Sequence, residues 1–180
     1  QQQLFEATFG VRAKAFRNTE LSYNDEVAQW ADSAGFSTIL AEGWDPILGW
    51  RSPHFVYQPQ NTEQIRLLLK DYKLSDDIAF RFGNKQWSEF PLDAGKYQQW
   101  AEAALLNGPL LNLFMDYETF GEHQWKDSGI FEFFEDLIGR WAAHPEYEFY
   151  TVSGAAAAFE PAGELSMERT VTWADTERDL

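Results

Sequence analysis

The chain contains no cysteine, so it forms no disulfide, has no thiolate nucleophile and binds no metal through cysteine. Its three histidines, His54, His123 and His144, are scattered and lack the spacing of a metal site. No serine stands in a Gly-x-Ser-x-Gly turn, and there is no glycine-rich phosphate loop. These absences exclude several common classes of enzyme. The lack of cysteine also fits a cytoplasmic protein, which is the location that we expect.

Long apolar runs and positive charges are also scarce. No window approaches the ~18 consecutive apolar residues of a membrane-spanning helix. Lys and Arg number 14 against 29 Asp and Glu, which gives a net charge of −15. A surface with this charge repels nucleic acids and anionic membranes, so we expect neither as a partner. A neutral polymer such as a glucan is not repelled.

Aromatic side chains, by contrast, are abundant, with 8 Trp, 15 Phe and 7 Tyr in 180 residues. A flat apolar ring suits the C–H face of a sugar as well as a packed core, so some of these rings are expected to line a ligand cleft. For any single ring, packing in the core is an equally good explanation. The long aperiodic segment 42–60, which includes Trp50, is a candidate wall of such a cleft.

Strand-like and helix-like segments alternate along the chain. Strands or extended segments are expected at 13–17, 36–41, 77–82, 110–115 and 148–152. Helices are expected to begin near Asp25, Asn61, Asp93, Ile130 and Ser153. This alternation predicts an α/β fold with a parallel sheet and helices packed outside it. Both an open sheet and a partial barrel fit five strands, and we favour the partial barrel.

Acidic residues follow three of the expected strands. Glu20 and Glu42 come just after the first two strands, and Asp116 comes directly after the apolar run 110–115. Because the C-terminal ends of parallel strands meet at one edge of a sheet, we expect these carboxylates at one mouth. An apolar strand end would desolvate Asp116 and keep it protonated, as a general acid requires. An acidic residue in such a turn can equally serve only to cap a helix or to pair with an arginine.

Several segments together resemble glycoside hydrolase family 57, specifically its α-amylase-type branch. The segment 16–21, Phe-Arg-Asn-Thr-Glu-Leu, is similar to the family segment that carries the catalytic nucleophile, which implies that role for Glu20. The segment 115–121, Met-Asp-Tyr-Glu-Thr-Phe-Gly, resembles the segment of the general acid/base, which implies that role for Asp116. The segments 47–53, 74–80 and 173–179 also resemble that branch, and the last is similar to a segment that helps to bind substrate.

The resemblance implies a parallel (β/α)7-type barrel, a retaining mechanism, α-1,4-glucan substrates such as starch and maltooligosaccharides, and neither a metal nor an organic cofactor. We expect substrate-binding roles for Glu42, Trp50, Glu118, His123, Trp125, Trp173 and Asp175. The His-Gln-Pro strand that opens the family is not found here, and the last shared segment stops at Leu180. We therefore expect residues 1–180 to be an internal part of one catalytic barrel, without its first strands and its C-terminal helices. The sequence leaves the oligomeric state open.

Three alternatives to a glucan hydrolase stay open. A 4-α-glucanotransferase would use the same residues and pass the glycosyl group to a sugar instead of water. A metal-dependent polysaccharide deacetylase would need a pair of histidines near an aspartate, which the sequence does not show. A non-catalytic glucan-binding fragment would bind maltooligosaccharide without releasing new reducing ends. If Glu20 were not the nucleophile, Glu42 would be the next candidate.

Overall fold

The computed structural model describes residues 2–174, which fall into two compact units. The first unit contains residues 2–70 and 150–174, and the second contains residues 71–149. Each unit has its own buried apolar cluster, and each is described by itself. The single catalytic domain expected over residues 1–180 stays a prediction.

Helices and short strands alternate in the described chain. The α-helices are α1 (Gln2–Phe9), α2 (Asp25–Ser33), α3 (Asp45–Leu48), α4 (Tyr72–Asp76), α5 (Ala94–Leu105), α6 (Ile130–Ala143) and α7 (Val152–Ala158). Single turns of other helix types are η1 (Thr19–Leu21), η2 (Asp77–Arg81), η3 (Tyr117–Thr119) and η4 (Lys126–Ser128). The strands are β1 (Ala15–Arg17), β2 (Thr38–Glu42), β3 (Gln58–Pro59), β4 (Arg66–Lys70) and β5 (Glu164–Leu165). Within residues 2–174, no helix combines the length and the apolar character needed to cross a membrane.

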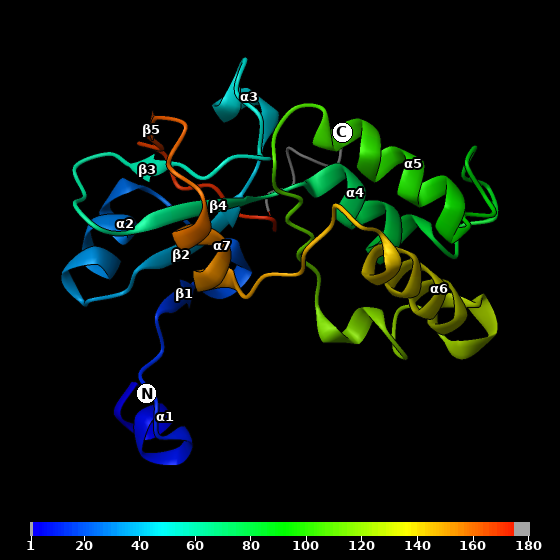
Figure 1. Ribbon diagram of the computed structural model, residues 1–180, viewed down its shortest axis with the longest axis horizontal. Coiled ribbons are helices and arrows are strands. Elements are labelled where there is room, and N and C mark those ends of the chain that lie inside the picture. Colours follow the sequence, from blue (N-terminus) through cyan, green and yellow to red (C-terminus); the bar gives the residue numbers. More distant parts are fainter. Residues whose placement is uncertain (1, 175–180) are drawn as a thin grey trace. The chain divides into compact units, whose positions relative to one another are not determined.

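The first unit is built on a parallel sheet of three strands in the order β1-β2-β4 (Figure 1). Thr38 of β2 is the register partner of Ala15 in β1 and of Arg66 in β4, so the three strands run in step. A second, two-stranded parallel sheet pairs β3 with β5. The predicted α/β class with parallel pairing is therefore confirmed, as are the expected strands at 13–17 and 36–41.

The two faces of the three-stranded sheet are covered differently, because successive side chains of a strand point to opposite faces. Ile39, Ala41, Leu67 and Leu69 belong to the buried cluster that includes Ala28 and Ala31 of α2. The helix α7 lies against β2 and β4 (Figure 1). A hollow beside this helix is lined by residues that include Thr38 and Arg66, whose side chains alternate with those of the buried cluster and so point to the second face of the sheet. The second face also carries Glu42 and Lys70 where these strands end.

The helix α2 begins at Asp25, as the sequence predicts. Asn24 precedes it with an extended backbone, and its side chain accepts a hydrogen bond from the backbone N–H of Val27. Gly35 follows it with φ = +83°, a conformation that only glycine adopts at little cost. The chain can therefore reverse and enter β2 within a few residues.

The core of the second unit lies between α5 and α6. Tyr97 of α5 is fully buried with Ile130 and Leu137 of α6, and its hydroxyl donates to the carbonyl of Leu74 at 2.9 Å. Asp93 caps α5 by accepting from the N–H of Lys96. The helices predicted after Asp93 and from Ile130 are therefore confirmed.

The helix predicted to begin at Asn61 is wrong. Asn61 has φ = +57°, which is not the extended backbone of a helix N-cap. The N–H groups of Glu63 and Ile65 instead donate to the carboxylate of Asp32 at 2.8 and 3.0 Å. The apolar residues that follow form β4, because pairing with β2 outweighs their local preference for a helix.

The strand predicted at 77–82 is also wrong. This segment continues α4 as the π-helical turn η2. Ile78 and Phe82, four residues apart, are both buried in the core of the second unit. The apolar residues therefore have helical spacing, which a short run cannot distinguish from a strand by composition alone.

The last two predicted strands are wrong as well. Residues 110–115 form no strand. Their backbone bonds instead to residues at and near the start of α4. The carbonyl of Asn112 accepts from the N–H of Asp71, and the N–H of Phe114 donates to Oγ of Ser75. Residues 148–151 carry no strand either, and α7 follows them. Its cap is Thr151 rather than Ser153. The polar partners that replace the sheet in residues 110–115 come from distant parts of the chain, so the sequence pattern gave no sign of them.

Candidate active site

Glu20 follows β1 directly and has an unusual backbone. Its φ is +53° and that of Leu21 is +50°, in the left-handed region that residues other than glycine rarely adopt. Such conformations cost free energy and persist where surrounding contacts impose them. Here Leu21 is fully buried, and Asn18 accepts from the N–H of Thr19 and donates to the carbonyl of Ser22. The turn therefore presents Glu20 as an exposed side chain at the C-terminal end of a strand.

A segment from the far end of the described chain holds this turn. Val171 forms an antiparallel bridge with Tyr23 through backbone hydrogen bonds of 2.8 and 2.9 Å. The carbonyl of Glu20 accepts from the N–H of Trp173 at 3.0 Å and from the hydroxyl of Thr172 at 2.7 Å. The indole N–H of Trp173 also donates to Oε2 of the Glu20 carboxylate at 2.6 Å. Both the backbone and the side chain of Glu20 are thereby oriented.

The other carboxylate oxygen of Glu20 is placed differently. Within residues 2–174, Oε1 makes no hydrogen bond and Glu20 takes part in no ion pair. An exposed carboxylate with one oxygen fixed and the other available has the arrangement that a nucleophile requires.

Two cations lie by the ring of Trp173. The guanidinium carbon of Arg17 is 4.5 Å from the ring centroid, and Nζ of Lys70 is 5.2 Å from it. Both distances are within cation–π range. Neither residue was predicted from the sequence as part of the site. Arg17 could have been noticed because it stands in the motif around Glu20, but Lys70 was hidden by the wrong helix prediction.

Glu42 forms a buried ion pair at the end of β2. Its Oε2 lies 3.5 Å from Nζ of Lys70, and the two side chains are 0% and 3% exposed. Its Oε1 accepts from the N–H of Gly43 at 3.1 Å. At Gly43 an added Cβ would lie 2.2 Å from the backbone oxygen of Lys70, so the two strand ends approach closely only because this residue is glycine. This burial suits Glu42 to holding Lys70 rather than to contacting a substrate.

Asp116 lies in the second unit, just before η3. The expectation that an apolar strand desolvates it is wrong, because no strand precedes it and its side chain is exposed. It does not cap η3 with its side chain, and its backbone carbonyl accepts from the N–H of Thr119 at 3.1 Å. The neighbouring Tyr117 is 95% exposed. Since Glu20 and Asp116 belong to different units, their spacing stays a prediction.

The loop after Asp116 carries three more of the predicted binding residues. Glu118, His123 and Trp125 are all exposed, and the carbonyl of Glu118 accepts from the N–H of His123 at 2.8 Å. Gln124 anchors this loop: it is buried, and its amide donates to the carbonyl of Ala79 at 3.3 Å. A set of exposed polar and aromatic side chains on an anchored loop suits ligand binding.

Of the remaining predicted residues, Trp50 is 88% exposed on the loop after α3, where its ring lies 5.1 Å from the guanidinium of Arg51. Asp175 lies outside the described residues. No group of three or more acidic, histidine or cysteine side chains within residues 2–174 is arranged to hold a metal ion.

Comparison with known proteins gives one family. Residues 1–168 match the model of "Glycosyl hydrolase family 57". A protein of Methanocaldococcus jannaschii named "Putative alpha-amylase" is 46% identical over 180 residues, which cover 99% of this chain and 38% of that protein. The crystal structure of a 4-alpha-glucanotransferase from Thermococcus litoralis has a similar fold, with a TM-score of 0.68 and 19% identity over 92% of this chain and 26% of that one. The chain thus spans less than half the length of each, and it belongs to glycosyl hydrolase family 57.

Proposed function

We propose that the protein cleaves α-1,4-glucans by a retaining mechanism in which Glu20 is the nucleophile and Asp116 is the general acid/base. The observation that supports this most strongly is the orientation of Glu20 by the indole N–H of Trp173 on a left-handed turn at a strand end. Family membership supports a glycosyl-cleaving or glycosyl-transferring enzyme, and the 46% identical relative is named "Putative alpha-amylase".

The proposed reaction proceeds in two displacements. Oε1 of Glu20 attacks the anomeric carbon while the C–O bond to the leaving sugar breaks and Asp116 gives that oxygen its proton. Asp116 then takes a proton from water, and the water oxygen displaces Glu20 from the anomeric carbon. Two inversions restore the original configuration. This requires a separation of about 5–5.5 Å between the two carboxyl groups.

The nearby side chains support this chemistry in distinct ways. Trp173 fixes Oε2 of Glu20, which leaves Oε1 to attack. We assign Lys70 and Glu42 to positioning, because their buried ion pair supports the cation next to the Trp173 ring. Trp50 and Trp125, with Glu118 and His123, would contact the glucan chain. The three-stranded sheet would form part of the (β/α)7-type barrel that the family resemblance implies.

Glucan transfer is the second candidate, because a sugar hydroxyl can replace water in the second displacement without any change of residues. The ratio of chain-transfer products to new reducing ends, measured on maltoheptaose, distinguishes the two reactions.

Azide rescue tests the assignment of both carboxylates in the full-length protein. In Glu20→Ala, azide can occupy the vacated space and attack once, so the expected product is the inverted β-glycosyl azide. In Asp116→Ala, assayed with an activated aryl glycoside, azide intercepts the glycosyl-enzyme and gives the α-azide. Glu63→Gln, a change at an exposed glutamate, serves as the control and should keep full activity. Full activity of Glu20→Ala without azide would contradict the assignment.

A further inference from the structure

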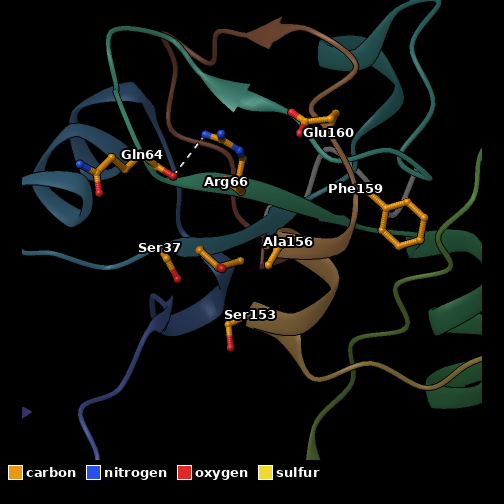
Figure 2. A pocket seen from close by; sticks show the side chains of 9 residues that line it. Ser37, Gln64, Arg66, Ser153, Ala156, Phe159 and Glu160 are labelled. Carbon is orange, nitrogen blue, oxygen red and sulfur yellow. Dashed lines mark hydrogen bonds between the residues drawn. The ribbon is translucent and has the colours of Figure 1, made fainter.

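The hollow beside α7 lies where β2 and β4 begin, at the opposite end of the sheet from Glu20 (Figure 2). It is lined by Ser37, Thr38, Gln64, Arg66, Ser153, Ala156, Ala157, Phe159 and Glu160. Thr38 and Arg66 open their strands, whereas Glu42 and Lys70 end them. The two ends of each strand are four residue steps apart, or about 13 Å at ~3.3 Å per residue. The hollow is therefore distinct from the site around Glu20.

The walls of this hollow offer both donors and acceptors. Arg66 supplies a guanidinium, Glu160 a carboxylate, and Ser37 and Ser153 hydroxyl groups, and all four come from β4, the approach to β2, and α7 with the segment after it (Figure 2). Phe159 adds an apolar ring. The volume is about 230 Å³. That is below the roughly 300–1,000 Å³ of sites for drug-sized ligands, so a single small ring is the largest unit that it suits.

Arg66 has unused capacity for a ligand. Its Nη1 donates to the side-chain oxygen of Gln58 and to the carbonyl of Gln64 at 3.2 Å, as the dashed line in Figure 2 shows for Gln64. Within residues 2–174 its Nε and Nη2 donate no hydrogen bond, and it pairs with no carboxylate. Glu160, on the same hollow, is likewise in no ion pair with a described residue. In a chain with 29 acidic residues, an arginine without a carboxylate partner in a concave site indicates a binding group.

Thr38 provides a second, independent observation. Its side chain is fully buried at the hollow, and Oγ1 has no hydrogen-bond partner among the described residues. A buried hydroxyl without a partner is unfavourable, and most buried polar groups are bonded to protein or to ordered water. A ligand with its own hydroxyl groups would supply the missing partner once the side chains above Thr38 adjust.

We propose that this hollow binds one ring of a neutral glucan chain, as a second, non-catalytic site. A sugar ring presents vicinal hydroxyls that accept from Arg66 and donate to Glu160, and its C–H face suits the ring of Phe159. A phosphate would be repelled by Glu160 and an ammonium group by Arg66, so the mixed charge favours a neutral polyol. The choice of an α-glucan rests on the proposed function; the existence of the site does not.

Calorimetric titration of the full-length protein with maltotriose tests this site. A Glu20→Gln background prevents turnover during the measurement. Arg66→Met removes the guanidinium, and Ala157→Met, at an exposed position of α7, fills the hollow without removing a polar group. Arg169→Met is the matched control, because Arg169 is exposed and does not line the hollow.

We expect two binding events in the background and in Arg169→Met. Arg66→Met and Ala157→Met should each weaken one event at least 10-fold while their thermal unfolding is unchanged. Trp173→Ala should remove only the other event. If both hollow variants titrate like the background, the second site is refuted, and an event lost in Trp173→Ala still supports the proposed function. If the background binds no maltotriose at all, both proposals are contradicted.

Discussion

The indole N–H of Trp173 donates a 2.6 Å hydrogen bond to Oε2 of Glu20, a residue 153 positions earlier in the chain. This contact joins the turn after β1 to the last described segment. It fixes one oxygen of the carboxylate and orients the other. The chemistry that we propose for Glu20 therefore depends on two distant segments that meet at the edge of one sheet.

Trp173→Phe removes the indole N–H but keeps an aromatic ring beside Arg17 and Lys70. A hydrogen bond to a charged group contributes about 1.5–3 kcal/mol, so kcat should fall about 10- to 150-fold. KM for maltooligosaccharides should change much less, because the ring surface is largely kept. Trp30→Phe, at a 53% exposed ring of α2, is the control and should leave kcat unchanged. An unchanged kcat in Trp173→Phe would show that the contact does not position the nucleophile.

The Glu42–Lys70 ion pair should be strongly coupled, because both side chains are almost fully buried. Glu42→Gln or Lys70→Met alone removes one partner of a buried pair and should cost about 3–5 kcal/mol of unfolding free energy. The double variant should cost clearly less than the two single costs together. Urea unfolding of the four proteins measures this coupling.

The exposed pair Arg140–Asp136 in α6 is the control for that cycle, with side chains 47% and 53% exposed. Its coupling should stay below about 1 kcal/mol. Additive effects of Glu42→Gln and Lys70→Met would mean that the two side chains do not interact as the structure shows.

Gly43→Ala and Gly139→Ala should change the free energy of unfolding in opposite directions. A Cβ at Gly43 would lie 2.2 Å from the backbone oxygen of Lys70, so the strand ends must move apart, at a cost of about 1–3 kcal/mol. Nothing lies within 4 Å of a Cβ at Gly139, inside α6, where alanine should stabilise the helix by about 0.5–1 kcal/mol. Urea unfolding checks both signs, and a stabilised Gly43→Ala would contradict the close approach of β2 and β4.

The partly buried carboxyl group of Asp77 should make the stability of the protein depend on pH. Burial raises the pKa of its carboxyl, and the Arg81 guanidinium, 2.6 Å away, lowers it only in part. Asp71 and Asp76 raise the pKa further. The pKa of Asp77 is higher in the folded protein than in the unfolded chain, where it is about 4. The stability that this group contributes is therefore complete below about pH 4 and is lost as the pH rises through the pKa of the folded protein.

Asp77→Asn does not titrate, so its free energy of unfolding should improve relative to the wild type between about pH 4 and pH 7. Asp136→Asn, in the exposed pair with Arg140, is the matched control and should show a smaller change. Chemical unfolding at a series of pH values measures both differences. A difference for Asp77→Asn that is independent of pH, or that moves in the wild type's favour, would contradict the assigned cause.

Local signals in the sequence predicted the well-capped elements of the fold. Asn24 and Gly35 bound α2, and Asp93 begins α5, because side-chain capping and a left-handed glycine act within a few residues. The segment after Asn61 was predicted incorrectly because its outcome depends on Asp32 and on pairing with β2, which are distant in sequence. Short apolar runs such as 77–82 carry no local feature that separates a strand from a helical turn.

The candidate site shows the same limit. The position of Glu20 after a strand was predicted and is observed, whereas its role as nucleophile stays a prediction. The contribution of Lys70 could not be predicted, because it is defined by the distance of its ammonium group from the ring of Trp173. The burial of Glu42 likewise depends on its pairing with a residue from another strand.

Trapping the glycosyl-enzyme tests the central claim most directly. A 5-fluoro-α-glucosyl fluoride should glycosylate the nucleophile of the full-length protein and be released slowly, because fluorine destabilises the positive charge that develops on the ring. Peptide mass spectrometry after proteolysis should then find one added fluoroglucosyl group, on Glu20. A label on Glu42, Asp116 or any other residue would contradict the account.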